Sequence, residues 1–295
     1  SLLGVAPFLL TAIAIAAYAK ASGADNLIAR AFTGRLLPMI VVASIVGAFS
    51  PFCSCGVIPL IAALLVMGVP LPAVMAFWLA SPLMDPSMFV LTLGTLGLTF
   101  ALYKAFAAVA LGLIGGFGTA LLMKNGAFAD PLRPEVGNGG CGGARIRNPK
   151  AVVWRFWEEP ARRATFAKSG LDTTLFLGKW LALAFLLESL MIAWIPAELV
   201  ASTLGGAGIL PVVTAVLVGV PAYLNGYAAL PLIGGLMGQG MTPGAGMAFL
   251  IAGGVTSMPA AIAVWALAKP PGFLAYVGFS LGGAMALGLL FNAYY

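Results

Sequence analysis

Hydrophobic residues form long blocks along this chain, and polar residues gather in a few short stretches between them. The apolar blocks lie at about 2–19, 36–50, 52–68, 70–82, 86–98, 100–123, 174–195, 208–223, 226–241, 244–268 and 272–292. Several blocks hold 16 residues or fewer, whereas a membrane-spanning helix needs about 20. Short apolar blocks bounded by Gly and Pro predict broken or re-entrant helices. Their exposed backbone survives in a membrane only where protein covers it or where it lines a water-filled cavity.

An internal repeat divides the chain. Residues 59–80 align without gaps with residues 231–252, 172 positions later, and ten of the 22 positions are identical. After one inserted residue, a weaker match resumes between 100–106 and 273–279. Repeats of this kind are typical of secondary transporters, whose substrate sites lie where broken helices from the two halves meet. A duplication with purely structural consequences is the alternative.

Three units follow from the repeat and from the basic residues. They are a first membrane repeat at 1–123, a linker at 124–171 and a second membrane repeat at 172–295. The linker and the loop 20–35 are basic and are therefore predicted to be cytoplasmic. Each half then crosses the membrane an odd number of times, which predicts repeats of inverted topology.

The number of crossings stays open at this stage. Each half has either five crossings, or three crossings plus a re-entrant hairpin, which in the first half is 36–68. The first block, 2–19, is interpreted as a membrane helix and not as a signal peptide, because it lacks a basic leader and a clear cleavage site. Lys104 falls on the outer side in this scheme and is the exception to the charge rule.

Composition agrees with an all-α integral membrane protein. Hydrophobic residues make up 61% of the chain and charged residues 8%, with a mean hydropathy of +1.05, whereas soluble domains carry about a quarter charged residues. Nine of the 15 Lys and Arg residues lie between Lys124 and Lys168, so the net charge of +6 belongs to a loop and does not indicate nucleic-acid binding. The chain has no histidine, which excludes imidazole metal ligands and Ser-His or Cys-His catalytic pairs. We expect no enzymatic activity and no cofactor.

The linker has two parts. Residues 137–143 (GNGGCGG) are too rich in Gly to hold a structure of their own. Residues 150–168 mix aromatic and basic side chains, which favours an interfacial amphipathic helix on an anionic leaflet, although a solvated connector fits equally well. Cys141 is interpreted as a bystander thiol and not as a metal relay.

Cys53, Ser54 and Cys55 form the first candidate site, between two apolar blocks. A thiol at a helix N-terminus is biased towards thiolate, and two thiolates this close can bind one soft ion. Trivalent arsenic belongs with such thiophilic centres. The alternative is that both cysteines pack as small hydrophobic residues.

Asp85 is the second candidate, within the segment Ser81-Pro82-Leu83-Met84-Asp85-Pro86-Ser87. Two prolines four positions apart should break a helix. A carboxylate at membrane depth costs several kcal/mol, about 2.5–3.5 on insertion scales, and is a functional candidate; a helix cap is the alternative. Ser87 in the same break is included in the predicted site.

The second half contributes polar groups at matching positions. Asn225 and Tyr227 stand where the first half has its two cysteines, and Thr256 and Ser257 lie in the second break. A turn explains Asn225-Gly226 equally well. Glu188, inside an apolar block, could carry a coupling proton or reach an aqueous interface, and Asp85 is the other coupling candidate.

The segment PFCSCGVIPLIAALLVMGVPLPAVMAFWLASPLMDPS resembles the signature of the ArsP-type permeases, bacterial proteins that include efflux permeases for trivalent organoarsenicals. The matching elements are Pro51, Cys53, Cys55, Pro59, Gly68, Pro70, the run 77–82 and Pro86. The run 231–259 also fits the internal duplication of that family. The resemblance implies a transporter of the inner membrane that exports a thiol-reactive species. Asp85 stands where Asn is more familiar, which questions whether a neutral organoarsenical is the cargo.

The sequence therefore predicts a multi-pass secondary transporter for a small thiophilic substrate. Its partners are that substrate and the lipid bilayer, with no nucleic acid, and a homodimer is one option for its assembly. A channel or an uptake permease for a small anion, such as a sulfur-containing one, or for a metal species is the first alternative. A membrane redox enzyme that uses Cys53 and Cys55 is the second, although a disulfide across one residue is strained.

Overall fold

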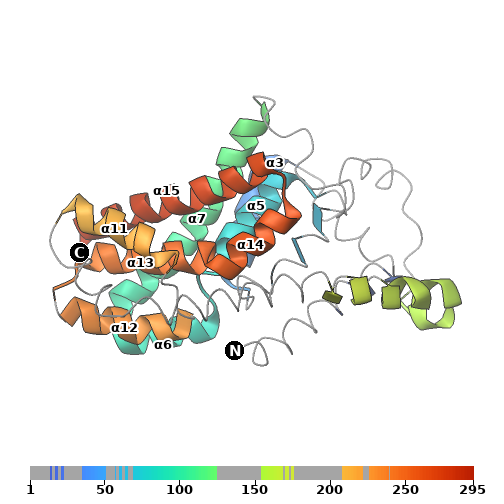
Figure 1. Cartoon of the computed structure of the whole chain (residues 1–295), viewed down its shortest axis with the longest axis horizontal. Helices are drawn as coiled ribbons and strands as arrows, with labels where there is room; N and C mark the ends of the chain where they lie inside the picture. Colours follow the sequence, from blue (N-terminus) through green and yellow to red (C-terminus); the bar gives the residue numbers. More distant parts are fainter. Residues whose placement is uncertain are drawn as a thin grey trace.

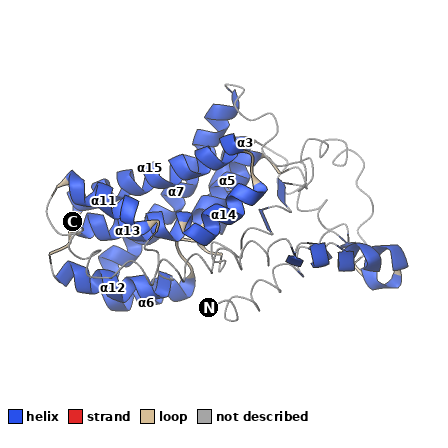
Figure 2. Ribbon diagram, in the orientation of Figure 1, coloured by secondary structure: helices blue, strands red, loops and turns tan. Residues whose placement is uncertain are grey.

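The computed structural model describes residues 35–50, 69–124, 154–168, 208–221, 226–238 and 240–295, with individual residues in 14–22, 57–65 and 170–175. Every element that it describes is a helix (Figure 2). The long helices lie side by side in one bundle, and the described part of the linker, 154–168, lies at the end of the molecule away from the C-terminus (Figure 1).

The first half of the bundle consists of α3 (Leu36–Ala48), α5 (Leu71–Ala80), α6 (Pro86–Leu96) and α7 (Leu98–Lys124). Prolines begin two of these helices: Pro70 is the N-terminal cap residue of α5, and Pro86 opens α6. Proline fits there because its missing N–H would have no helical partner. Gly97 separates α6 from α7 with a φ of 89°, a conformation that glycine adopts without steric cost. Helices α3, α5 and α7 pack against one another.

The second half consists of α11 (Ile209–Gly219), α12 (Gly226–Gly238), α13 (Pro243–Thr256), α14 (Met258–Leu267) and α15 (Pro270–Tyr294). Helices α11, α13 and α15 pack together as α3, α5 and α7 do. Helices α13 and α15 begin 172 residues after the first residues of α5 and α7, and α11 begins 173 residues after the first residue of α3. The offset found in the sequence therefore relates whole helices, in the same order.

Close contacts at glycines confirm the offset in detail. A Cβ built on Gly116 of α7 would lie 2.5 Å from Cγ2 of Ile40, 2.9 Å from Cβ of Ala76 and 3.1 Å from the carbonyl oxygen of Pro72. A Cβ built on Gly288 of α15 would meet the same three positions of the second half at similar distances, from Val212, Ala248 and Gly244. Gly47 and Gly219 likewise lie against Phe77 and Phe249. Small residues allow membrane helices to approach this closely.

These contacts correct one detail of the sequence alignment. The weaker match that paired 100–106 with 273–279 needed one inserted residue and an offset of 173. The pairing of Gly116 with Gly288 keeps the offset at 172 through α7 and α15. The aromatic residues suggested the insertion, but packed glycines report the helix register more reliably because their neighbours leave no room for a side chain.

Helices α7 and α15 run antiparallel. Early in α7, the hydroxyl of Tyr103 donates a hydrogen bond to the carbonyl oxygen of Leu287, late in α15, at 2.9 Å. Late in α7, Gly118 lies against Phe279, early in α15. Between these contacts, Leu111 lies against Gly283, its own counterpart in the repeat. Because Leu111 and Gly283 occupy equivalent positions of the two repeats, their contact marks the point where α7 and α15 cross.

Two helices, α7 with 27 residues and α15 with 25, are long and apolar enough to cross a membrane. Helix α13 and the helix that follows it pass the same test together, as a pair bent by 42°. Helices α3, α5, α11 and residues 229–238 of α12 are apolar but shorter. Short and broken helices are thus confirmed, whereas the number of crossings and the inverted arrangement of the repeats stay predictions.

The described part of the linker contacts the first apolar block. Arg162 donates a hydrogen bond to the carbonyl oxygen of Ala21 at 2.9 Å, and the hydroxyl of Tyr18 donates one to the carbonyl oxygen of Trp154 at 3.1 Å. Trp154 and Trp157 are exposed. Exposed aromatic rings fit an interfacial helix and a solvated connector alike, so the interfacial helix stays a prediction.

Candidate functional site

The predicted site residues fall into three groups. Asp85, Thr256 and Ser257 are fully described. Ser87 and Tyr227 are the second residues of α6 and α12, and only their backbone is described. The remaining predicted positions, Cys53, Ser54, Cys55, Glu188 and Asn225, lie outside the described residues.

The first break separates α5 from α6 at residues 81–85, as the two prolines predicted. Asp85 caps α6: the backbone amide of Met88 donates a hydrogen bond to its Oδ1 at 2.8 Å. A carboxylate at a helix N-terminus satisfies a free amide and interacts favourably with the helix dipole. Asp85 is therefore a helix cap, which the sequence left as the alternative, and its electrostatic role is described below.

Two buried serines connect the first break to the chain that leads to the cysteines. The hydroxyl oxygens of Ser50 and Ser81 are 2.9 Å apart and share a hydrogen bond. The Ser50 hydroxyl also lies 2.7 Å from the carbonyl oxygen of Gly47, to which it donates, which leaves Ser81 as the donor between the two serines. Ser50 comes three residues before Cys53 in the sequence. Sequence reasoning did not assign a role to either serine.

The second break is a single residue long. Helix α13 continues to Thr256, α14 begins at Met258, and Ser257 alone separates them. Thr256 and Ser257 are buried, and the Thr256 hydroxyl donates a hydrogen bond to the carbonyl oxygen of Ala252 at 2.6 Å. Ser257 occupies the position that corresponds to Asp85. Helices α6 and α14 thus begin with different chemistry, a carboxylate at Asp85 in one and a hydroxyl at Ser257 in the other.

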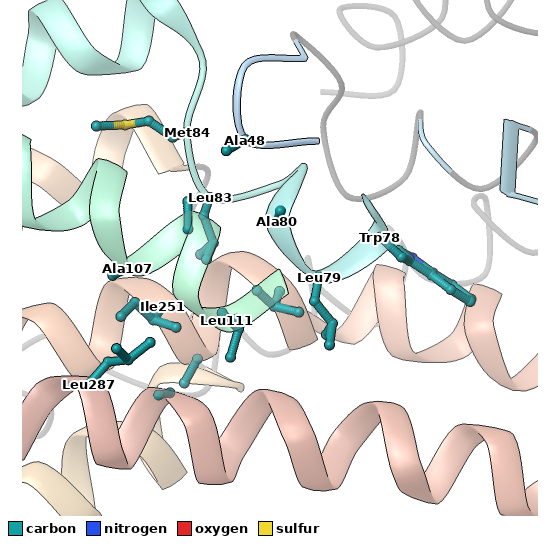
Figure 3. Packing of buried hydrophobic residues seen from close by; sticks show 14 of the residues in the cluster. Ala48, Trp78, Leu79, Ala80, Leu83, Met84, Ala107, Leu111, Ile251 and Leu287 are labelled. Atoms are coloured by element: carbon teal, nitrogen blue, oxygen red, sulfur yellow. The ribbon is translucent and has the colours of Figure 1, made fainter. Parts of the chain in front are cut away.

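The first break lies against the last turn of α13, just before the second break. A Cβ built on Gly254 would be 3.2 Å from Cδ2 of Leu83 and 3.6 Å from the carbonyl oxygen of Pro82, the residue that corresponds to Gly254 in the first half. Figure 3 shows Leu83 and Met84 of the first break among Ala107 and Leu111 of α7, with Ile251 of α13 nearby. Pro82 and Gly254 occupy equivalent positions of the two repeats, as Leu111 and Gly283 do, and both pairs lie in contact. The structure therefore places the first break against the end of the helix that leads into the second break; that the two form one site stays a prediction.

Lys104 is a buried cation that sequence reasoning did not include in the site. It lies in the second turn of α7, and only 3% of its surface is exposed. The expectation that it lies on the outer side, as an exception to the charge rule, gave no hint of this burial. Because Gly97 alone separates α6 from α7, the helix starts early enough to carry Lys104 into the bundle. A lone charge inside the run LTFALYKAFAAVALGLIGG was the available signal.

Asp85, the cap of α6, attracts Lys104 electrostatically. The position that corresponds to Lys104 in the second half is Tyr276, which is also buried and whose hydroxyl donates a hydrogen bond to the carbonyl oxygen of Val255. The ring of Tyr276 lies 5.1 Å from that of Trp78, measured between centroids. In the second half this position connects α15 to the end of α13 through a neutral hydroxyl, whereas the first half has a lysine there.

Comparison with known proteins decides the family. Residues 1–293 match the model of the ArsP_1 family, which is described as a predicted permease. The chain belongs to the ArsP_1 family. Membership in this family agrees with the resemblance carried by the Cys-Ser-Cys segment and with the long apolar helices α7 and α15. As a member of a predicted permease family, this ArsP_1 protein is a membrane transport protein.

A curated relative has a name that gives no substrate. The UPF0718 protein YcgR of Bacillus subtilis (strain 168) is 28% identical over 130 residues. The match covers 43% of this chain and 44% of the relative, so the alignment spans less than half the length of either protein. No solved structure matches the chain.

Proposed function

We propose that this ArsP_1 protein is a secondary transporter that exports a thiol-reactive substrate, such as a trivalent organoarsenical, across the inner membrane. The observation that carries the proposal is the contact of Pro82 and Leu83, in the first break, with Gly254 in the last turn of α13, three residues before the second break. Transporters built from repeats form their substrate sites from discontinuous helices of both halves, because broken helices offer free backbone groups to a ligand.

The antiparallel course of α7 and α15 supports a transporter with inverted repeats. Helices related by an axis in the membrane plane run in opposite directions and cross at that axis. The crossing at Leu111 and Gly283, between the two halves, has this form. The contact between Pro82 and Gly254 also joins counterparts, so both fit one axis through the centre of the bundle.

The thiols of Cys53 and Cys55 are the proposed ligands of the substrate. The hydrogen bond between Ser50 and Ser81 supports this role because it fixes the start of the cysteine segment at the first break. Three residues extend at most about 11 Å, which limits how far Cys53 can lie from Ser50. Thiolates bind soft centres such as trivalent arsenic in preference to hard ones.

The remaining predicted residues complete the proposal. Asp85 and Ser87 from the first break, and Thr256 and Ser257 from the second, would line the same site. Asn225 and Tyr227 would approach it from the second half, opposite the cysteines, and Glu188 is a further candidate for proton coupling.

Transport of methylarsenite into everted membrane vesicles tests the proposal. We expect the native protein to accumulate the compound, and Cys53→Ser and Cys55→Ser to lose binding and transport while they remain folded. Cys141→Ser is the matched control and should transport normally, since its thiol lies in the linker and not in the repeats. Gel filtration in detergent verifies that each variant is folded.

Two outcomes contradict the proposal in different ways. If Cys53→Ser and Cys55→Ser transport methylarsenite normally, the cysteines are packing residues. If the native protein does not transport the compound, the substrate class is wrong, and small anions that move without a proton gradient become the next candidates.

A further inference from the structure

Lys104 occupies a depth at which a charge is costly. It lies seven residues from Leu111, where α7 crosses α15, which is about 10 Å along the helix axis. Half the hydrocarbon core of a bilayer is about 15 Å thick. If the crossing lies at the membrane centre, as the proposed inverted repeats require, Lys104 is inside the hydrocarbon region. Only 3% of its surface is exposed, so it cannot escape this cost by extending to the interface.

Asp85 offers a negative charge to this cation. It caps α6, which packs against α7, the helix of Lys104, and the two groups attract each other electrostatically. The Asp85 carboxylate accepts a hydrogen bond from the amide of Met88 and lies at the start of α6, and both features stabilise its negative charge. Asp85 is therefore a suitable counter-ion for a cation at Lys104.

The position in the second half that corresponds to Lys104 is occupied by a neutral residue, Tyr276. Tyr276 there binds the carbonyl oxygen of Val255, two residues before Ser257 in the second break. A neutral hydroxyl is thus sufficient to connect the long helix to its break. A lysine at this position adds a group that can gain and lose a proton, and structural needs alone do not explain that choice.

Few other ionisable groups lie around Lys104. Helices α3, α5, α6 and α15 pack against α7, and α5 carries none. In the described part of these helices and their first and last flanking residues, the ionisable groups are Arg35, Asp85, Lys269, Tyr276, Tyr294 and Tyr295. Arg35 and Lys269 precede the first turns of α3 and α15, and the last two tyrosines lie at the end of α15. Tyr103 and Lys124 are the other such groups of α7 itself. Among all of these, Asp85 is the charge that acts on Lys104.

We propose that Lys104 is the group that takes up and releases the coupling proton of the transport cycle, with Asp85 as its counter-ion. The proposal rests on the proposed export function and assigns coupling to a residue other than Glu188. Lys104 gains one proton as an ammonium when the site is open to the outside. It releases that proton to the cytoplasm and becomes a neutral amine when the site is open to the inside. One proton then enters for each substrate that leaves, and the carboxylate of Asp85 stays unchanged.

The test uses purified protein in liposomes, methylarsenite as substrate and an imposed pH gradient. Lys104→Arg keeps the positive charge but removes the proton transfer, because a guanidinium does not deprotonate in proteins. We expect this variant to exchange methylarsenite across the membrane without a gradient, but to lose all accumulation driven by the pH gradient. Lys124→Arg, at the end of the same helix, is the matched control and should accumulate substrate as the native protein does.

A second variant guards against misfolding. Arginine is larger than lysine, so Lys104→Arg could fail to fold. The variant Lys104→Met removes the ammonium without enlarging the side chain, and the Asp85 carboxylate keeps the amide of Met88 as a hydrogen-bond partner. We expect it to exchange substrate without coupling. Accumulation driven by the pH gradient in either folded variant overturns the proposal.

The coupling proposal can be separated from the choice of substrate. If the native protein does not transport methylarsenite, the proposed cargo is wrong, and Lys104 is then tested without any substrate. Stability in detergent is measured against pH for the native protein and for both variants. A titration step that is present in the native protein and absent from the variants supports the proposal, since linkage ties stability to proton binding. Identical pH profiles overturn it.

Discussion

The glycines of α15 provide a direct test of the repeat packing, because the same substitution can be made at open and closed positions of one helix. A Cβ on Gly288 would lie 2.7 Å from Cβ of Ala248 and 2.8 Å from the carbonyl oxygen of Gly244. A Cβ on Gly282, in the same helix, would meet no atom within 4 Å. We expect Gly288→Ala to destabilise the protein and Gly282→Ala to be neutral or slightly stabilising.

The magnitude follows from the contacts. Forcing extra atoms into a closed site costs about 1–3 kcal/mol, and the helix preference of Ala over Gly offsets up to about 1 kcal/mol. That preference is the same at both positions and cancels when the two variants are compared. The difference should therefore be about 1–3 kcal/mol. One of the two close neighbours of Gly288 is a backbone oxygen, which cannot move aside as a side chain can.

Reversible unfolding in mixed detergent micelles measures this difference. Gly116→Ala, at the corresponding position of α7, should behave as Gly288→Ala does, because its Cβ would meet Ile40, Ala76 and Pro72 in the same arrangement. Equal stability of Gly282→Ala and Gly288→Ala would refute the reasoning, since the contacts between α13 and α15 would then not be as tight as described.

Three further changes test particular hydrogen bonds by the same unfolding measurement. Tyr276→Phe leaves the carbonyl oxygen of Val255 without its partner and should cost about 1–3 kcal/mol, whereas the same change at an exposed tyrosine should cost nothing. Thr242→Ala removes the cap that accepts from the amide of Ala245 and should cost about 0.5–2 kcal/mol; a serine at this position should restore most of it, and a full loss with serine would contradict the capping role. Replacing Ser50 and Ser81 by alanine, singly and together, should reveal a coupling energy of about 0.5–1.5 kcal/mol; strictly additive effects would show that the two hydroxyls act independently.

The sequence alone determined the class, the repeat and the breaks. Apolar blocks dictate helices in a membrane because no water is present to satisfy exposed backbone groups. Pro82 and Pro86 marked the first break, since proline removes a backbone donor and clashes with the preceding turn. The offset of 172 correctly paired α5 with α13. The family also followed from sequence, because the Cys-Ser-Cys segment and its prolines carry the resemblance directly.

The tertiary structure decided which positions meet. The sequence could list Asp85 and Ser257 as candidates, but contact between the first break and the end of α13 depends on the crossing of α7 and α15, which no local pattern encodes. Lys104 shows the limit most clearly. The positive-inside rule assigns the charge of Lys104 to one side of the membrane. Whether its side chain is buried depends instead on which face of α7 packs against the neighbouring helices. Rotation of a helix that is apolar on every side is set by close packing of glycines such as Gly116 and Gly288, and that packing exists only once the helices have assembled.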